Sequence, residues 1–175
     1  MKTSILEYLE ESARKYPDKT AFADEHTSCT FKELEQTARR TGTALAKHFT
    51  PRNPVPVFME KSVETIGVFM GAVYAGCFYV PVNPMNPAER LRKIMEKLEP
   101  EVIISDEKGK EQLAAVGVGL EEKVIGPETL LPTTGTDLSE EQRSKLKQIQ
   151  GQWKETDALY GIFTSGSTGT PKAIV

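Results

Sequence analysis

Near its C-terminal end, the chain carries a run of hydroxyl residues, glycines and one lysine with the composition of a phosphate-binding loop. The run extends from Thr164 to Lys172 and follows an apolar stretch, residues 158–163, that predicts a strand. Glycine has no Cβ, so the backbone N–H groups around Gly166 and Gly169 can approach a phosphate closely. The ammonium group of Lys172 can neutralise a β or γ phosphate. The pattern therefore predicts a cradle for a triphosphate.

The residues expected to hold the phosphates are Thr164, Ser165, Gly166, Ser167, Thr168, Gly169 and Lys172. Their spacing is not that of the P-loop, which ends in Gly-Lys-Ser or Gly-Lys-Thr, because Pro171 precedes the lysine and Ala173 follows it. A flexible Ser/Gly/Thr linker is disfavoured, since apolar sequence flanks the loop on both sides. No catalytic residue and no metal-binding residue is predicted elsewhere in the chain.

The overall charge and the N-terminal sequence argue against several classes of partner. The 22 basic residues are scattered among 25 acidic ones, so no basic face for nucleic acid is expected. No apolar run reaches the ~18 residues of a membrane span. The N-terminus lacks the cationic start and apolar stretch of a signal peptide. We therefore expect a cytoplasmic protein with neither nucleic-acid nor membrane partners.

The cysteines and histidines are not expected to form a site. Cys29 and Cys77 have neither metal-ligand spacing nor a nearby histidine cluster, so free buried thiols are expected. His26 and His48 have no partners in the sequence and are expected at the surface.

Hydrophobic periodicity predicts helices that alternate with strands. Helices are expected over residues 5–16, 31–48, 63–75, 87–98 and 111–116, and strands over 20–23, 55–59, 78–82, 102–104, 124–125 and 158–163. Residues 127–151 are polar and are interpreted as a surface connection with one weak helix begun by Ser139. This order predicts an α/β fold with a mainly parallel sheet flanked by helices.

Polar residues mark the expected helix starts. Capping residues are predicted at Ser4 with Glu7, Thr30 with Glu33, Asn86 with Glu89, Ser139 with Gln142, and at Ser62. In the third helix, Gly67 and Gly71 are spaced for close packing against a neighbour. Gly76 is placed to cap the end of that helix.

Three stretches, in this order, resemble motifs of the adenylate-forming (AMP-binding) superfamily. Thr30-Phe31-Lys32-Glu33-Leu34 is similar to the first motif, and the Thr164 to Lys172 loop is similar to the signature loop. Gly71 to Val82, together with Pro87-Ala88-Glu89-Arg90-Leu91, is similar to the second motif. The motifs look most like those of the amino-acid adenylation domains of nonribosomal peptide synthetases and of D-alanine carrier-protein ligases.

The resemblance implies that residues 1–175 are the N-terminal part of the large AMP-binding domain, ending just after the signature loop. Such enzymes use Mg-ATP to activate a carboxylate, here an amino acid, as an acyl-adenylate. The acyl group then passes to the thiol of a carrier-protein phosphopantetheine or of coenzyme A. The adenine, ribose, magnesium and carboxylate sites of the family lie downstream of the loop, so the 175 residues alone are expected to be inactive.

Two departures from the family pattern stand out. Asn83 occupies a position where aspartate is common, and Ala173 a position where glycine is common. Ala173 would restrict the backbone if its position required a positive φ. The strand expected after the loop is also predicted to lack a pairing partner within the chain.

Two other functions stay open at the level of the sequence. One is a standalone nucleotide-binding or regulatory module that keeps the loop without catalysis. The other is a structural fragment that associates with itself through an exposed apolar surface.

Overall fold

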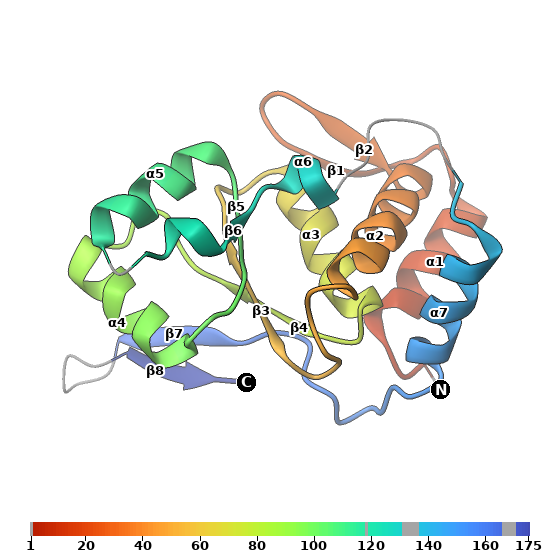
Figure 1. The fold of residues 1–175 in the computed structure, drawn as a ribbon. Coiled ribbons are helices and arrows are strands. Elements are labelled where there is room, and N and C mark those ends of the chain that lie inside the picture. The colour runs from red at the N-terminus through yellow and green to blue at the C-terminus, as the bar shows by residue number, and fades with distance from the viewer. Residues whose placement is uncertain (1, 118, 131–136, 166–170) are drawn as a thin grey trace.

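Helices and strands alternate along the chain, and the computed structural model describes residues 2–117, 119–130, 137–165 and 171–175 (Figure 1). The helices are α1 (Ile5–Lys15), α2 (Phe31–Leu45), α3 (Val63–Tyr74), α4 (Ala88–Leu98), α5 (Glu107–Val116), α6 (Pro127–Leu130) and α7 (Glu140–Gln150), with the 3-10 helix η1 (Glu121–Lys123). The strands are β1 (Thr20–Ala23), β2 (Ser28–Thr30), β3 (Pro54–Phe58), β4 (Phe78–Pro81), β5 (Ile103–Ser105), β6 (Val124–Ile125), β7 (Ile162–Ser165) and β8 (Pro171–Ile174). The predicted α/β fold class is confirmed.

The central sheet has the strand order β4-β3-β5-β6, and every neighbouring pair is parallel. Val57 and Phe58 of β3 are buried, as are Ile103 and Ile104 of β5. Apolar strands of this kind occur in parallel sheets that are covered on both faces. Helices α4 and α5 cover one face, and α2 and α3 cover the other (Figure 1). The prediction of a mainly parallel sheet flanked by helices is therefore confirmed.

The connections between strands reverse direction at β3. The chain passes from β3 through α3 to β4, and then from β4 through α4 to β5 on the opposite side of β3. Ligand sites in open α/β sheets lie outside the carboxyl ends of strands, near such a reversal. The segments that follow β3 and β4 are therefore the first places to search for a site.

The chain returns to the sheet just before the predicted phosphate loop. Tyr160 forms a parallel bridge with Tyr79 of β4. The Tyr79 N–H donates to the Leu159 carbonyl over 3.3 Å, and the Gly161 N–H donates to the Tyr79 carbonyl over 2.9 Å. This pairing places the start of β7 beside β4.

Helices α2 and α3 approach each other closely at glycines. A Cβ added to Gly71 would lie 2.5 Å from Thr41 Cγ2, and one added to Gly42 would lie 2.5 Å from Tyr74 Cβ. Gly67 also faces α2, since a Cβ added there would lie 3.0 Å from Thr37 Cγ2. The close packing predicted for Gly67 and Gly71 is confirmed.

The predicted helix caps are confirmed with one exception. The residues whose side chains accept a hydrogen bond from a backbone N–H of the following helix are Ser4, Thr30, Ser62 and Ser139. The cap predicted at Asn86 is wrong, because Pro87 is the N-cap and makes no side-chain capping bond. Asn86 Oδ1 instead accepts a hydrogen bond from Arg90 Nε over 3.2 Å.

Two helix ends differ from the prediction. Helix α5 begins at Glu107, earlier than expected, because the Asp106 side chain accepts a hydrogen bond from the Gly109 N–H over 2.7 Å. Helix α3 ends with Ala75 as its C-cap, and Gly76 follows at a φ of 76°, a conformation that favours glycine.

Within residues 127–151, the helix predicted to begin at Ser139 is confirmed as α7, whereas α6 was not predicted. Each of the two helices is also anchored to the core by one leucine, which the prediction of a surface connection did not include. Leu130 of α6 and Leu146 of α7 are buried. Gln150 Nε2 donates to Glu10 Oε1 over 3.1 Å, and Glu10 also accepts hydrogen bonds from Arg39 and from the Tyr74 hydroxyl. This network joins α7 to α1, α2 and α3, which a polar sequence does not reveal.

The close approach of α2 and α3 predicts that Gly71→Ala destabilises the protein. The added methyl overlaps Thr41, whose Cβ is fixed to the α2 backbone, so an overpacking cost of about 3 kcal/mol is expected. This exceeds the ~1 kcal/mol that alanine gains over glycine in a helix. Urea denaturation followed by circular dichroism would measure the change in the free energy of unfolding.

Gly151→Ala is the matched control. Its Cβ would lie 3.5 Å from the Lys147 carbonyl, an ordinary contact, and Gly151 has a φ of −64° that alanine adopts freely. The control should stay within about 0.5 kcal/mol of the wild type. Equal stabilities of the two variants would contradict the close-packing account.

Candidate functional site

Strands β7 and β8 form an antiparallel pair that joins the two ends of the predicted phosphate loop. Thr164 lies opposite Lys172, and Ser165 lies opposite Pro171. Residues directly opposite in such a pair present their side chains on the same face, so a hydroxyl and an ammonium group are brought together. The expectation that β8 would lack a pairing partner is wrong, because β7 supplies it. The remaining predicted site residues, Gly166, Ser167, Thr168 and Gly169, lie outside the described residues.

Helix α4 is hydrogen-bonded to both strands of this pair. Arg90 Nη2 donates to the Phe163 carbonyl over 3.4 Å, and Lys97 Nζ donates to the Pro171 carbonyl over 3.3 Å. The Phe163 side chain packs against the core formed by α4 and the sheet. Arg90 and Lys97 therefore tie one strand each to α4, a role that sequence reasoning missed.

Ala173, at the position where the family commonly has glycine, does not strain the strand pair. Ala173 lies in β8 opposite Phe163. Among the described residues other than glycine, positive φ angles occur only at Arg52 and Glu99. The backbone of Ala173 is thus one that any residue can adopt.

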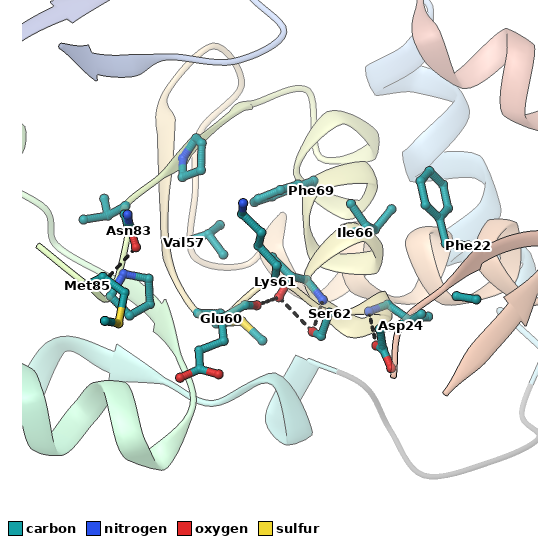
Figure 2. Close-up of a pocket in the computed structure, with 17 residues that line it drawn as sticks. Phe22, Asp24, Val57, Glu60, Lys61, Ser62, Ile66, Phe69, Asn83 and Met85 are labelled. Atoms are coloured by element: carbon teal, nitrogen blue, oxygen red, sulfur yellow. Dashed lines mark hydrogen bonds between the residues drawn. The ribbon is translucent and has the colours of Figure 1, made fainter. Parts of the chain in front are cut away.

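A cleft of about 920 Å³ lies where β3 and β4 end and α3 begins (Figure 2). Its lining residues are Phe22, Ala23, Asp24, Val57, Met59, Glu60, Lys61, Ser62, Val63, Thr65, Ile66, Phe69, Pro81, Val82, Asn83, Pro84 and Met85. Most of these side chains are apolar. The hairpin formed by β1 and β2, whose antiparallel pairing was not predicted, supplies one end of the cleft.

Asp24 fixes that hairpin to the start of α3. Its carboxylate accepts backbone N–H hydrogen bonds from Val63 over 2.9 Å and from His26 and Thr27 over 2.8 Å each. The bond from Val63, followed by those from His26 and Thr27, holds the pKa of Asp24 well below its usual range. Asp24 is therefore ionised at neutral pH and engaged by its own backbone neighbours.

Two adjacent charges after β3 point in different directions. Figure 2 shows the Glu60 carboxylate directed away from Lys61, whose ammonium group points toward the Phe69 side of the cleft. Glu60 forms an ion pair with Lys108 of α5. On the opposite wall, Asn83 Oδ1 accepts a hydrogen bond from the Met85 N–H over 2.9 Å. Sequence reasoning missed the cleft because its lining comes from separate segments.

The cysteines, histidines and acidic residues offer no second site in the described residues. Burial raises the pKa of the Cys77 thiol to about 11, so this buried cysteine is a poor nucleophile. Cys29 is only half-buried, and His26 and His48 are exposed. Within the described ranges, no group of three or more His, Cys, Asp or Glu residues could hold a metal ion. No helix in this part of the chain has both the length and the apolar character to cross a bilayer.

A family model and several known proteins match nearly the whole chain. The model of a family described as "AMP-binding enzyme" matches residues 9–175. Bacitracin synthase 1 of Bacillus licheniformis is 31% identical over 177 residues, covering 98% of this chain and 3% of that protein. A D-alanine--D-alanyl carrier protein ligase of Bacillus velezensis is 34% identical over 174 residues, covering 97% of this chain and 32% of the ligase. The chain thus spans a third or less of these relatives.

Solved structures share the fold. The NpsA N-terminal subdomain of Klebsiella oxytoca, in complex with 3-hydroxybenzoyl-AMSN, matches with a TM-score of 0.76 and 20% identity over 99% of this chain and 40% of that one. The nonribosomal peptide synthetase FmoA3, in an AMPPNP-bound form, matches with a TM-score of 0.76 and 23% identity over 99% of this chain and 17% of that one. The arrangement of helices and strands is therefore that of an adenylation N-terminal subdomain.

The hydrogen bonds of Asp24 predict a pH-dependent effect of Asp24→Asn. Because the folded-state pKa is lowered, the carboxylate contributes stability above the ordinary Asp pKa of about 3.9. That contribution is lost as the pH falls through the folded-state pKa. The wild type should therefore exceed the variant in thermal stability above about pH 5, and the difference should shrink toward pH 2.

Asp18→Asn, at an exposed carboxylate in the turn before β1 that accepts none of the hydrogen bonds described for Asp24, is the control and should stay close to the wild type in thermal stability. Thermal melts of the three proteins across this pH range make the comparison. A constant gap between wild type and Asp24→Asn would show that the Asp24 hydrogen bonds do not depend on its charge.

Proposed function

Because the chain belongs to the AMP-binding enzyme family, we propose that residues 1–175 form the N-terminal part of the large domain of an ATP-dependent acid–thiol ligase. The observation that carries the proposal is the pairing of Thr164 with Lys172 at the base of the predicted phosphate loop. The family match over residues 9–175 supports the same reading of the loop.

The proposed parent enzyme joins an amino acid to a thiol in two steps. The amino-acid carboxylate attacks the α-phosphate of ATP, giving an acyl-adenylate and releasing pyrophosphate. The thiol of a carrier-protein phosphopantetheine or of coenzyme A then displaces AMP. The support for an amino-acid substrate and a carrier-protein acceptor comes from relatives named as a D-alanine--D-alanyl carrier protein ligase and a bacitracin synthase.

The strand pair would act on the β and γ phosphates. Lys172 is exposed and can supply a positive charge, while Thr164 supplies a hydroxyl donor from the facing position. We assign the same role to Ser165, Gly166, Ser167, Thr168 and Gly169. Holding the phosphates in a fixed orientation stabilises the leaving pyrophosphate by position and charge, with no covalent step.

Magnesium would reach this site bound to the phosphates of ATP. The described residues offer no carboxylate cluster for it, whereas Lys172 and Thr164 suit phosphate oxygens. The bound ion would neutralise charge on the phosphates.

A standalone nucleotide-binding module is the second candidate function. It is favoured by the anchoring of both strands of the pair on α4 through Arg90 and Lys97. With both strands held inside the chain, phosphate binding needs no further domain. The two candidates differ in catalysis, not in binding.

The proposal predicts that Lys172→Ala weakens ATP binding. Loss of one charge-assisted contact at this exposed position should raise the Kd about tenfold. Isothermal titration of the 175-residue chain with ATP measures the change. Lys145→Ala, at an exposed lysine of α7, is the control and should bind as the wild type does. Equal affinities for all three proteins would contradict a phosphate site at Lys172.

The 175 residues alone should not catalyse adenylation. A phosphate site without walls that align the nucleotide base and the carboxylate cannot bring the reactants together. The check is ATP–pyrophosphate exchange with a mixture of amino acids, using the purified chain. Sustained exchange would contradict this prediction and show that the chain contains a complete active site.

A further inference from the structure

The cleft between α3 and the ends of β3 and β4 is not used by the proposed phosphate site. Its volume of about 920 Å³ lies within the ~300–1,000 Å³ typical of small-molecule sites. Its position outside the carboxyl ends of parallel strands is also where α/β folds bind ligands. The apolar part of its wall comes chiefly from Phe22, Val57, Met59, Ile66 and Phe69.

The charged side chains that line the cleft differ in whether they already have hydrogen-bond or ion-pair partners. Asp24 accepts three backbone hydrogen bonds, and Glu60 is paired with Lys108 outside the cleft. Lys61 forms no ion pair within the described part of the chain, and its ammonium group faces the apolar wall (Figure 2). The charge left for a ligand is therefore one positive charge beside an apolar surface.

Asn83 adds a second donor. Its Oδ1 already accepts a hydrogen bond from the Met85 N–H, so the side-chain NH₂ is the group that it can offer to a ligand. An ammonium group and an amide N–H each suit carboxylate oxygens, so both walls of the cleft offer a donor to such a group.

We propose that this cleft binds a small molecule with one carboxylate and an aromatic or branched aliphatic body. Lys61 pairs with the carboxylate, and the body lies on Ile66 and Phe69. A cationic ligand is disfavoured, since it would meet the Lys61 charge and find Asp24 and Glu60 engaged. The site shares no residue with the β7–β8 pair, so the inference does not depend on nucleotide binding there.

The test uses naphthaleneacetate and its uncharged analogue naphthaleneacetamide, titrated into the chain labelled with ¹³C at the methionine methyl groups. Met59 and Met85 line the cleft, whereas Met95 is a buried residue of α4 and does not line it. We expect saturable shifts of the Met59 and Met85 signals with the carboxylate and an unchanged Met95 signal. The amide should bind about tenfold more weakly because it lacks the charge.

Two variants change the charge of the cleft by one unit in the same direction. Lys61→Met removes a positive charge, and Asn83→Asp adds a negative one. Both should weaken binding of the carboxylate about tenfold and leave binding of the amide nearly unchanged. Lys61→Arg should retain carboxylate binding, and Lys145→Met, at an exposed lysine of α7, should have no effect.

Three results would overturn the inference. The first is the absence of saturable shifts at Met59 and Met85, and the second is equal affinities for the carboxylate and the amide. The third is a shift of both methionine signals with rising protein concentration in the absence of ligand. The last result would mean that a second copy of the chain fills the cleft. Failure of ATP to bind at Lys172 would leave all of these readouts unaffected, so the two proposals fail separately.

Discussion

The close contact between α2 and α3 is the constraint on which the rest of the structure depends. Helix α3 packs on β3 and β4, and α2 contacts α1 and α7 on its far side. A side chain at Gly71 or Gly42 would force the two helices apart, because less than 3 Å is available at either position. Since α3 begins at the cleft and β4 pairs with the residues leading into β7, both candidate sites take their positions from this contact.

Local sequence signals predicted most elements of the fold but not how they dock. The cap at Thr30 and the apolar run of β3 act within a few residues, so the sequence reveals them directly. Helix α7 has a polar sequence, and its attachment rests on Leu146 and on the Glu10–Gln150 hydrogen bond between distant segments. The start of α5 was missed because the residues after Asp106 are polar and carry no apolar periodicity.

The candidate sites were predictable to different degrees. Hydroxyl, glycine and lysine types mark the region of Thr164 and Lys172, although their pairing depends on the backbone path. Arg90 and Lys97 act on backbone carbonyls, which have no signature in a sequence. The cleft could not be predicted because β1, β3, α3 and the segment after β4 meet only in the folded chain.

The pairing of residues 159–161 with the edge of β4 matters while the chain is being synthesised. An unpaired strand edge can pair with another chain, and Leu159 to Gly161 cover this one. Tyr79 and Tyr160 are far apart in sequence, so this pairing can form only after the whole segment between them has been made. During synthesis, β4 leaves the ribosome well before Tyr160 does, and its edge stays open for that interval. The opposite edge, β6, is only two residues long and offers little backbone for pairing. Of the two edges of the central sheet, β4 is therefore the one that is open to pairing with another chain until residues 159–161 have been made.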